Sequence, residues 1–258
     1  MAAYLCTRKI LALWAINEPD NVWVWVTGVG WRKLDTTNTT NLLIEAARAK
    51  AIEALVDLVD ERRGDIHYIV EIYVWDPGKL PSGVEVTRSV SECIYGWTAR
   101  YRQERTHIVV RIQLTRDANV TQSELDSAMD RWKNGIEEKW SYFFACCSEM
   151  SATTSSDCSM PCELTFEVQW VTSGAHHMVS VHRGPGRSNM LNWYHDDSGD
   201  VASHEFGHML GHPDEYSDPQ CPNRSPVNTG TVMDDTTEVV ERLVEPFCQS
   251  LGQNAVPV

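Results

Sequence analysis

The sequence predicts a fold that combines helices and strands, of the α/β or α+β class. Three observations support this prediction. Several segments alternate apolar and polar residues as strands do, two long segments repeat apolar residues every three or four positions as helices do, and turn-forming residues separate them. The 258 residues suit one large domain or two smaller ones. We divide them into a small β-α-β unit at residues 1–98 and a second domain at residues 99–258.

The N-terminal unit is predicted to run strand, helix, strand. Val22–Thr27 is rich in β-branched and aromatic residues, which are typical of a strand. Apolar residues then recur at helical spacing from Leu43 to Leu58, so we expect one helix there. Ile66–Val74 alternates and predicts a second strand, which the turn residues Asp76–Gly78 would end. The role of this unit stays open between an inhibitory pro-segment, a substrate-binding or targeting module and an extension of the main sheet.

The second domain is predicted to begin with a strand and a long helix. Ile108–Leu114 alternates as a strand with one buried face does. Thr121–Glu124 has the pattern of a capping box, in which the threonine and glutamate side chains each accept a bond from a backbone N–H. The apolar residues from Leu125 to Phe143 then follow at helical spacing, and we interpret them as core contacts. Leu164–Trp170 and Met178–His182 predict two more strands.

Two further helices are predicted near the C-terminus. One carries a histidine motif that is analysed below. The other is expected to start at a second capping-box pattern, Asp235–Glu238. Pro246 should kink or end this helix, because proline lacks the backbone N–H that a helix needs.

Charge and hydropathy exclude some classes of protein. The 22 lysines and arginines and the 36 aspartates and glutamates give a net charge of −14, which disfavours binding to nucleic acid or to an anionic membrane. No apolar run reaches the ~20 residues that span a bilayer. Ile10–Ile16 weakly resembles a signal peptide but lacks a clear cleavage site, and we interpret it as a strand. The compartment is either the cytoplasm or one reached without a typical N-terminal signal, and the oligomeric state stays unknown.

The eight cysteines leave several alternatives open. An even number permits disulfides, and four of the eight lie between Cys146 and Cys162, so this region is either a disulfide-tied loop or a set of free thiols. A second, structural zinc site is disfavoured because paired CxxC spacings are absent. Cys6 or Cys93 could also cap a catalytic metal as a thiolate, although neither belongs to a known motif.

The most informative segment is a pair of histidines four residues apart. Residues at i and i+4 lie on one helix face, about 6 Å apart along the axis, so His204 and His208 can bind the same metal ion. Glu205 follows the first histidine directly, and its carboxylate can act as a general base on a metal-bound water. This spacing predicts a zinc hydrolase.

A catalytic zinc ion usually takes a third protein ligand and keeps one position for water. Gly211 is placed to end the helix, because glycine adopts the left-handed conformation that turns the chain back. Asp214 follows three residues later and is the favoured third ligand. His212 and Glu215 remain alternatives at this point.

The segment His204–Tyr216, with the sequence HEFGHMLGHPDEY, resembles the metzincin metallopeptidase consensus HExxHxxGxxH in its aspartate variant. Downstream, Gly230–Asp234 resembles the methionine turn of that family. The resemblance covers roughly residues 100–258 and implies a zincin-like fold: a twisted sheet with a backing helix, the active-site helix, the Met-turn and a C-terminal helix. Residues 1–98 resemble no family that we recognise.

The resemblance also implies roles for individual residues. One Zn²⁺ ion would be held by His204, His208 and Asp214, with Glu205 as general base. Met233 would form an apolar floor beneath the metal site. Separately from the resemblance, Tyr216 is a candidate donor to the oxyanion that develops in the reaction.

Three functions are compatible with this motif. The favoured one is a zinc endopeptidase acting on protein or peptide substrates. The alternatives are a zinc hydrolase of a non-protein amide, such as a cell-wall peptide or a small substrate, and an inactive zincin-fold binding protein. Calcium binding by the aspartates before the motif stays unsupported, because the helix dipole already favours acidic residues there; these residues are Asp196, Asp197 and Asp200.

Overall fold

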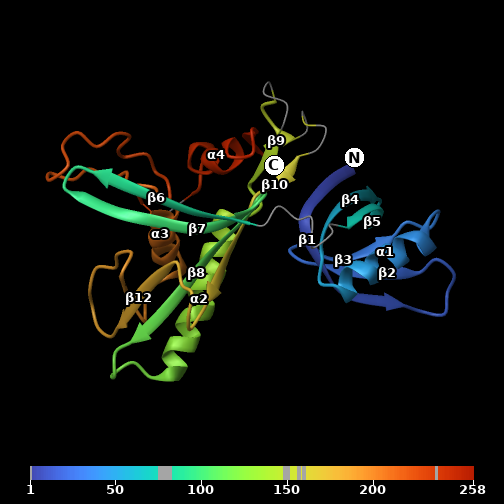
Figure 1. The fold of residues 1–258 in the computed structure, drawn as a ribbon, viewed down its shortest axis with the longest axis horizontal. Helices are drawn as coiled ribbons and strands as arrows, with labels where there is room; N and C mark the ends of the chain where they lie inside the picture. Colours follow the sequence, from blue (N-terminus) through green and yellow to red (C-terminus); the bar gives the residue numbers. More distant parts are fainter. Residues whose placement is uncertain (1, 75–82, 148–151, 156–157, 159–160, 236–237) are drawn as a thin grey trace.

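The computed structural model describes residues 2–74, 83–147, 152–155, 158, 161–235 and 238–258. The fold is mostly β, with 40 % strand and 23 % helix. The described strands form a closed five-stranded barrel, a six-stranded sheet and a three-stranded sheet (Figure 1). The expected zincin-like α/β fold, with one twisted sheet and a backing helix, is therefore wrong. The sequence patterns marked single strands, but they did not show that the N-terminal strands close into a barrel of their own.

The barrel occupies the N-terminal part of the chain. Its strands follow the order β1-β2-β3-β5-β4, and antiparallel pairing of β4 with β1 closes it. Helix α1 packs its buried face, which includes Leu42 and Ala46, into the same apolar core as Val24 and Leu58. The strands are β1 (Ala2–Ala15), β2 (Val22–Val26), β3 (Gly30–Leu34), β4 (Leu55–Arg63) and β5 (Ile66–Val74), and the helix is α1 (Thr39–Ala51).

The expected β-α-β unit is only partly correct. The predicted strands at β2 and β5 are confirmed, but the helix ends at Ala51 instead of continuing to Leu58. Val56 and Leu58 of β4 are both buried, so the chain follows a two-residue repeat here, although Leu58 had also fitted the predicted helical repeat. The predicted turn at Asp76–Gly78 lies outside the described residues.

The six-stranded sheet is centred on β8 (His107–Arg116). β11 (Thr165–Trp170) and β12 (His177–His182) pair in parallel with β8, one after the other along its length, and β13 (Asn192–Tyr194) pairs with β12. β7 (Tyr95–Glu104) pairs with β8 only through its last three residues. The rest of β7 pairs with β6 (Val84–Glu92), and this long hairpin runs past helix α3 (Figure 1).

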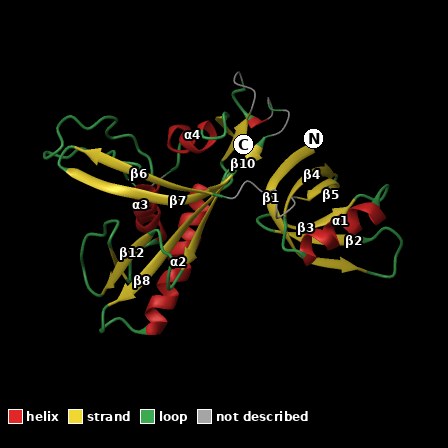
Figure 2. Ribbon diagram, viewed as in Figure 1, coloured by secondary structure: helices red, strands yellow, loops and turns green. Residues whose placement is uncertain are grey.

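Two helices cross beside this sheet (Figure 2). α2 (Gln122–Trp140) starts at the predicted capping box, where Thr121 accepts a bond from the Glu124 N–H, and α2 packs on both β11 and α3 (Gly199–Leu210). The helices meet at two glycines: a Cβ atom on Gly135 would lie 2.4 Å from the Cα of Gly199. The close crossing therefore depends on the absence of side chains at this point.

The C-terminal segment differs from its prediction. α4 (Glu241–Gln249) starts after Val240, which makes no side-chain cap, and not at the capping-box pattern Asp235–Glu238, of which residues 236–237 lie outside the described part of the chain. Pro246 lies inside α4, which continues to Gln249. The last strand pairs with β9 in the three-stranded sheet, which consists of β9 (Phe144–Cys147), β10 (Cys162–Glu163) and β14 (Asn254–Pro257).

All eight cysteines form disulfides, which decides between the alternatives left open by the sequence. Cys6 and Cys93 are bonded and so cannot act as thiolate caps on a metal. The pairs are Cys6–Cys162, Cys93–Cys221, Cys146–Cys248 and Cys147–Cys158.

The barrel is attached to the rest of the molecule through β1. The Cys6–Cys162 disulfide joins β1 to β10, and two residues further on, Arg8 forms a buried ion pair with Glu163. Asp57 of β4 accepts a bond from Arg105 at 2.8 Å. The division at residue 98 stays a prediction; by hydrogen bonding, β6 and all of β7 belong with the strands that follow them.

Among the described residues, no helix is both long and apolar enough to cross a membrane.

Candidate metal centre

Helix α3 presents the two motif histidines on one face. Ser198 caps its start by accepting a bond from the Val201 N–H at 3.3 Å. The rings of His204 and His208 lie 4.9 Å apart, centroid to centroid. Gly211 ends the helix in the left-handed conformation, with φ of 101°, as its sequence position predicts.

The turn after Gly211 brings Asp214 back to the histidines. Asp214 Oδ1 lies 3.1 Å from His204 Nε2 and 3.2 Å from His208 Nε2. One potential ligand atom from each of the three residues lies within 4.8 Å of the others. Among the described residues, these three form a group that could hold a metal ion. The structure thus brings together the three residues that the sequence favoured as ligands.

Backbone carbonyls orient both imidazoles. His204 Nδ1 lies 2.8 Å from the Val232 carbonyl oxygen, and His208 Nδ1 lies 2.8 Å from that of His212. When each Nδ1 donates its proton to the carbonyl, the Nε2 lone pair is free to face the metal position. The two nitrogens and the carboxylate oxygen therefore form a donor set that suits a divalent transition metal.

The two alternative ligands have other partners. The ring of His212 stacks on Trp140 at 5.8 Å, and complete burial lowers its pKa to about 3. Glu215 accepts bonds at 2.6 Å from the hydroxyls of Thr229 and Thr231 and forms an ion pair with Arg242. Neither residue belongs to the cluster of His204, His208 and Asp214.

The cluster is electrostatically coupled. Burial opposes ionisation of Asp214, but hydrogen bonds to His204 and His208 outweigh it and hold the pKa of this carboxyl far below its usual range. Burial also opposes the charged form of His208, yet the Asp214 and Glu205 carboxylates raise the pKa of this imidazole. A carboxylate kept ionised between two imidazoles is suited to neutralise a cation.

Glu205 lies close to the three potential metal ligands. Its side chain is only 5 % exposed, and its Oε2 atom has no hydrogen-bond partner among the described residues. Burial raises the pKa of this carboxyl. A buried carboxylate oxygen without a partner usually serves a purpose, since it loses hydration without compensation. The residue Glu205 lines a pocket of about 500 Å³ together with His204, His208 and Asp214.

The pocket has apolar walls that come from distant segments. Trp97 of β7 donates from Nε1 to the His208 carbonyl at 2.8 Å, and its ring meets the His208 ring edge-on at 5.6 Å. Met190 and Leu191 line the cavity from the loop before β13. Trp97 was missed by the sequence analysis, because it lies 111 residues from His208 and belongs to no motif.

The segment around Met233 packs against α3. Met233 is fully buried, and a Cβ atom on Gly207 would lie 2.2 Å from its sulfur. Its carbonyl accepts a bond from the Glu215 N–H at 2.8 Å, while the preceding residue, Val232, binds His204. The predicted turn thus contacts helix α3 on one side and the loop that carries Asp214 on the other.

Tyr216 extends the site on the side of Asp214. Its hydroxyl donates to Asp214 Oδ2 at 2.8 Å and accepts a bond from Arg187. Burial, followed by the neighbouring Asp214 carboxylate, raises the pKa of the phenol to about 12. Tyr216 therefore stays protonated at neutral pH, and in this structure its single O–H, at the wall of the pocket, is donated to Asp214.

Two of the aspartates around the start of α3 have protein partners. Asp197 accepts a bond from the Tyr194 N–H at 2.7 Å and another from Ser188. Asp200 pairs with Lys139 at 2.5 Å. In the described residues these carboxylates form no metal-binding group, and calcium binding stays unsupported.

Comparison of the chain with protein-family models, with curated proteins and with solved structures finds no significant match. The site's geometry alone therefore defines the class of protein: a mostly β fold with a partly buried His-His-Asp group that could hold a metal ion.

Proposed function

We propose that this protein is a zinc-dependent endopeptidase. The observation that carries the proposal is the convergence, in one pocket, of the three-residue donor set with the buried, unpartnered carboxylate of Glu205. The resemblance of the segment His204–Tyr216 to the metzincin consensus supports peptide bonds as the target. This part of the proposal concerns the active-site segment and not the fold.

The donor set favours zinc. Two imidazole nitrogens and one carboxylate oxygen are typical ligands of a catalytic zinc ion, which keeps its fourth position for water. The hydrogen bonds from His204 and His208 to backbone carbonyls are also typical of zinc-binding histidines, because they fix ring orientation and tautomer.

The residues of this chain then have separate tasks. Zinc would supply a polarised carbonyl and a water molecule of lowered pKa. Glu205 would serve as the general base that takes up a proton and passes it to the leaving amine, a role helped by the raised pKa of its buried carboxyl. Tyr216 stays protonated, and its O–H would turn from Asp214 to the substrate oxygen on which negative charge develops.

Two other functions share parts of this geometry. A zinc hydrolase of a non-protein amide would need the same water and the same base, so substrate tests must separate it from a peptidase. An inactive binding protein is disfavoured because Glu205 is present and lies in the pocket.

The four disulfides favour an oxidising compartment, since disulfides rarely persist in the cytosol. We therefore extend the proposal to a peptidase that works outside the cytoplasm.

The decisive experiment separates zinc binding from catalysis. Glu205→Ala should retain about one zinc per chain and lose casein cleavage by at least ~100-fold, because the general base is removed while the ligands remain. Glu138→Ala, an exposed substitution on α2, is the matched control and should behave as the wild type. Chelation should abolish cleavage by the wild type, and added zinc should restore it. Undiminished cleavage by Glu205→Ala would contradict the proposed mechanism.

A further inference from the structure

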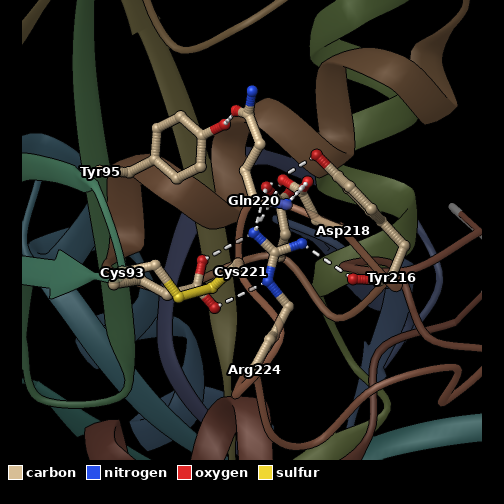
Figure 3. The surroundings of a disulfide bond; sticks show 9 residues. Cys93, Tyr95, Tyr216, Asp218, Gln220, Cys221 and Arg224 are labelled. Carbon is tan, nitrogen blue, oxygen red and sulfur yellow. Dashed lines mark hydrogen bonds and ion pairs between the residues drawn. A yellow bond between two sulfur atoms is a disulfide. The ribbon is translucent and has the colours of Figure 1, made fainter.

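A buried arginine lies between the tip of the β6–β7 hairpin and the segment Gly211–Arg224, which we call the ligand loop (Figure 3). The side chain of Arg224 is 1 % exposed. Its Nε and Nη2 atoms donate to the two carboxylate oxygens of Glu92, each at 2.9 Å, and its Nη1 donates to the Tyr216 carbonyl at 2.8 Å. The guanidinium therefore joins the hairpin to the loop that supplies the third metal ligand.

The same guanidinium faces the metal centre. Arg224 Nη2 lies 3.5 Å from Asp214 Oδ2, and the guanidinium carbon lies 4.9 Å from the centre of the Tyr216 ring. The two oxygens of Asp214 thus have different environments. Oδ1 faces the histidines, whereas Oδ2 faces the Tyr216 hydroxyl and Arg224. Contacts on Oδ2 alone orient the carboxylate so that Oδ1 points to the metal position.

Charge explains why an arginine is needed at this position. Three carboxylates surround it: Glu92, Asp214 and, at 3.9 Å, Asp218. Without a cation these groups would repel one another, and a neutral side chain would leave the carboxylates of Glu92 and Asp214 without their shared partner. The planar fork of arginine can bind Glu92 with two nitrogens and still present a third to the Tyr216 carbonyl.

A disulfide supports this arrangement. Cys93 follows Glu92 in the sequence, and its partner Cys221 accepts a bond from the Arg224 N–H at 3.0 Å. Next to it, the Tyr95 hydroxyl donates to Gln220 at 3.0 Å, as Figure 3 shows. The covalent bond therefore holds together the same two segments that the arginine and its glutamate partner join.

We propose that Arg224 is a positioning residue of the metal centre. It acts through Asp214 and Tyr216, whose carboxylate and phenol it holds in place, and Glu92 and the Cys93–Cys221 disulfide anchor it. The role in metal retention rests on the His204, His208 and Asp214 cluster, and its effect on cleavage rests on the proposed peptidase function.

The test measures zinc affinity by competition with a chromophoric chelator. Arg224→Gln should weaken zinc binding by about 10- to 100-fold, as losses of groups that orient metal ligands do. Arg224→Lys keeps the charge but not the fork and should recover part of the affinity. The matched control is Arg183→Gln, which removes an exposed ion pair with Glu124 and should leave zinc affinity unchanged. Circular dichroism and thermal unfolding check that each variant is folded.

Two more variants approach the same contact from the hairpin. Glu92→Gln and the double variant Cys93→Ser with Cys221→Ser should both weaken zinc binding in the same direction as Arg224→Gln. If Arg224→Gln does not fold, these variants decide the question. If Arg224→Gln is folded and binds zinc as tightly as the wild type, the proposal is overturned. If Arg224→Gln does not fold, wild-type zinc affinity in both hairpin variants overturns it.

Measurements of peptide cleavage distinguish a failure of the role of Arg224 from a failure of the proposed peptidase function. At saturating zinc, Arg224→Gln should lower kcat for a peptide and leave KM unchanged, because Arg224 acts through Tyr216 and does not line the pocket. A wild-type protein that binds zinc but cleaves no peptide would contradict the peptidase function, while the affinity comparison would still test Arg224. If the wild type does cleave peptide but binds zinc no more tightly than Arg224→Gln, only the role of Arg224 would be contradicted.

Discussion

Asp214 shows how the environment of a side chain selects a potential metal ligand. Three potential ligands stand within four residues of one another: His212, Asp214 and Glu215. His212 is buried against Trp140, and Glu215 is bound by two threonines and an arginine. Only Asp214 of these three joins the histidine cluster. The competing residues are thus removed by packing, which is not apparent from their spacing.

Substitutions at these positions should separate the two roles. Asp214→Ala should weaken zinc binding by more than ~100-fold, because it removes a ligand. His212→Ala should keep zinc but lower the free energy of unfolding by about 2–3 kcal/mol, because it leaves a cavity beside Trp140. Zinc content after dialysis and thermal unfolding measure the two effects. A loss of zinc in His212→Ala without loss in Asp214→Ala would reverse the ligand assignment.

At the scale of elements, the site depends on how α3 packs against α2. The Gly135–Gly199 crossing brings the start of the active-site helix against α2, and the Trp140 Nε1 donates to the Ser203 carbonyl at 3.1 Å. His204 follows directly after Ser203. The crossing point is therefore connected to the first metal ligand through a few consecutive residues.

Gly135→Ala tests this crossing. Alanine normally stabilises a helix relative to glycine by about 1 kcal/mol. At Gly135 the added Cβ would instead collide with the backbone of Gly199, and we expect a loss of about 1–3 kcal/mol in the free energy of unfolding. Asn134→Ala, at the neighbouring exposed position of α2, serves as control and should be neutral or slightly stabilising. Stabilisation by Gly135→Ala in chemical denaturation would show that the helices do not cross here.

A histidine on β12 links two strands and makes stability depend on pH. His177 Nε2 donates to the Arg100 carbonyl of β7 at 2.9 Å, and burial lowers the pKa of His177 to about 4. The unfolded chain, with a pKa near 6.5, binds the proton more readily than the folded one. His177 therefore contributes its full stability above about pH 6.5.

As the pH falls from about 6.5 towards 4, this contribution, about 3 kcal/mol at most, should be lost progressively. Urea unfolding measured across this range should show a falling free energy for the wild type. The slope should be smaller in His177→Gln, which cannot titrate. An equal slope in both proteins would show that other groups cause the pH dependence.

At the scale of the whole molecule, disulfides join parts that are distant in sequence. Cys6–Cys162 connects the barrel to the three-stranded sheet, Cys146–Cys248 connects that sheet to α4, and Cys93–Cys221 connects the hairpin to the ligand loop. Long-range bonds of this kind restrict the unfolded chain and so stabilise the fold.

Thiol labelling tests this whole-molecule arrangement. Under denaturing conditions without reductant, an alkylating reagent should modify no cysteine, and after reduction it should modify all eight. Mass spectrometry of peptides from the unreduced protein should show the four pairs named above. Free thiols in the purified, air-exposed protein would contradict the pairing and with it the proposed oxidising compartment.

Local features were predictable where one short segment contains the cause. The capping box at Thr121 and Glu124 is confirmed, as is the left-handed Gly211, because each depends on residues within one turn of helix. The run from Leu43 to Leu58 was misinterpreted because its apolar residues fit both a helical and a two-residue repeat. Residue propensity could not decide between a helix and a strand at the end of this run. The pairing of β4 with β1 and β5 decided in favour of a strand.

The sequence by itself placed two histidines and the favoured third residue in one segment, because His204, His208 and Asp214 lie within eleven residues on a helix and the turn that follows it. The tertiary structure decided between Asp214 and its neighbours His212 and Glu215. Only the tertiary structure decided the mostly β architecture, the disulfide pairs and the contacts of Trp97 and Arg224. The physical reason is the distance along the chain between the residues that interact. A helix and its cap are set by neighbouring residues, whereas barrel closure and the contacts of a hairpin with a loop depend on pairings between residues far apart in the chain.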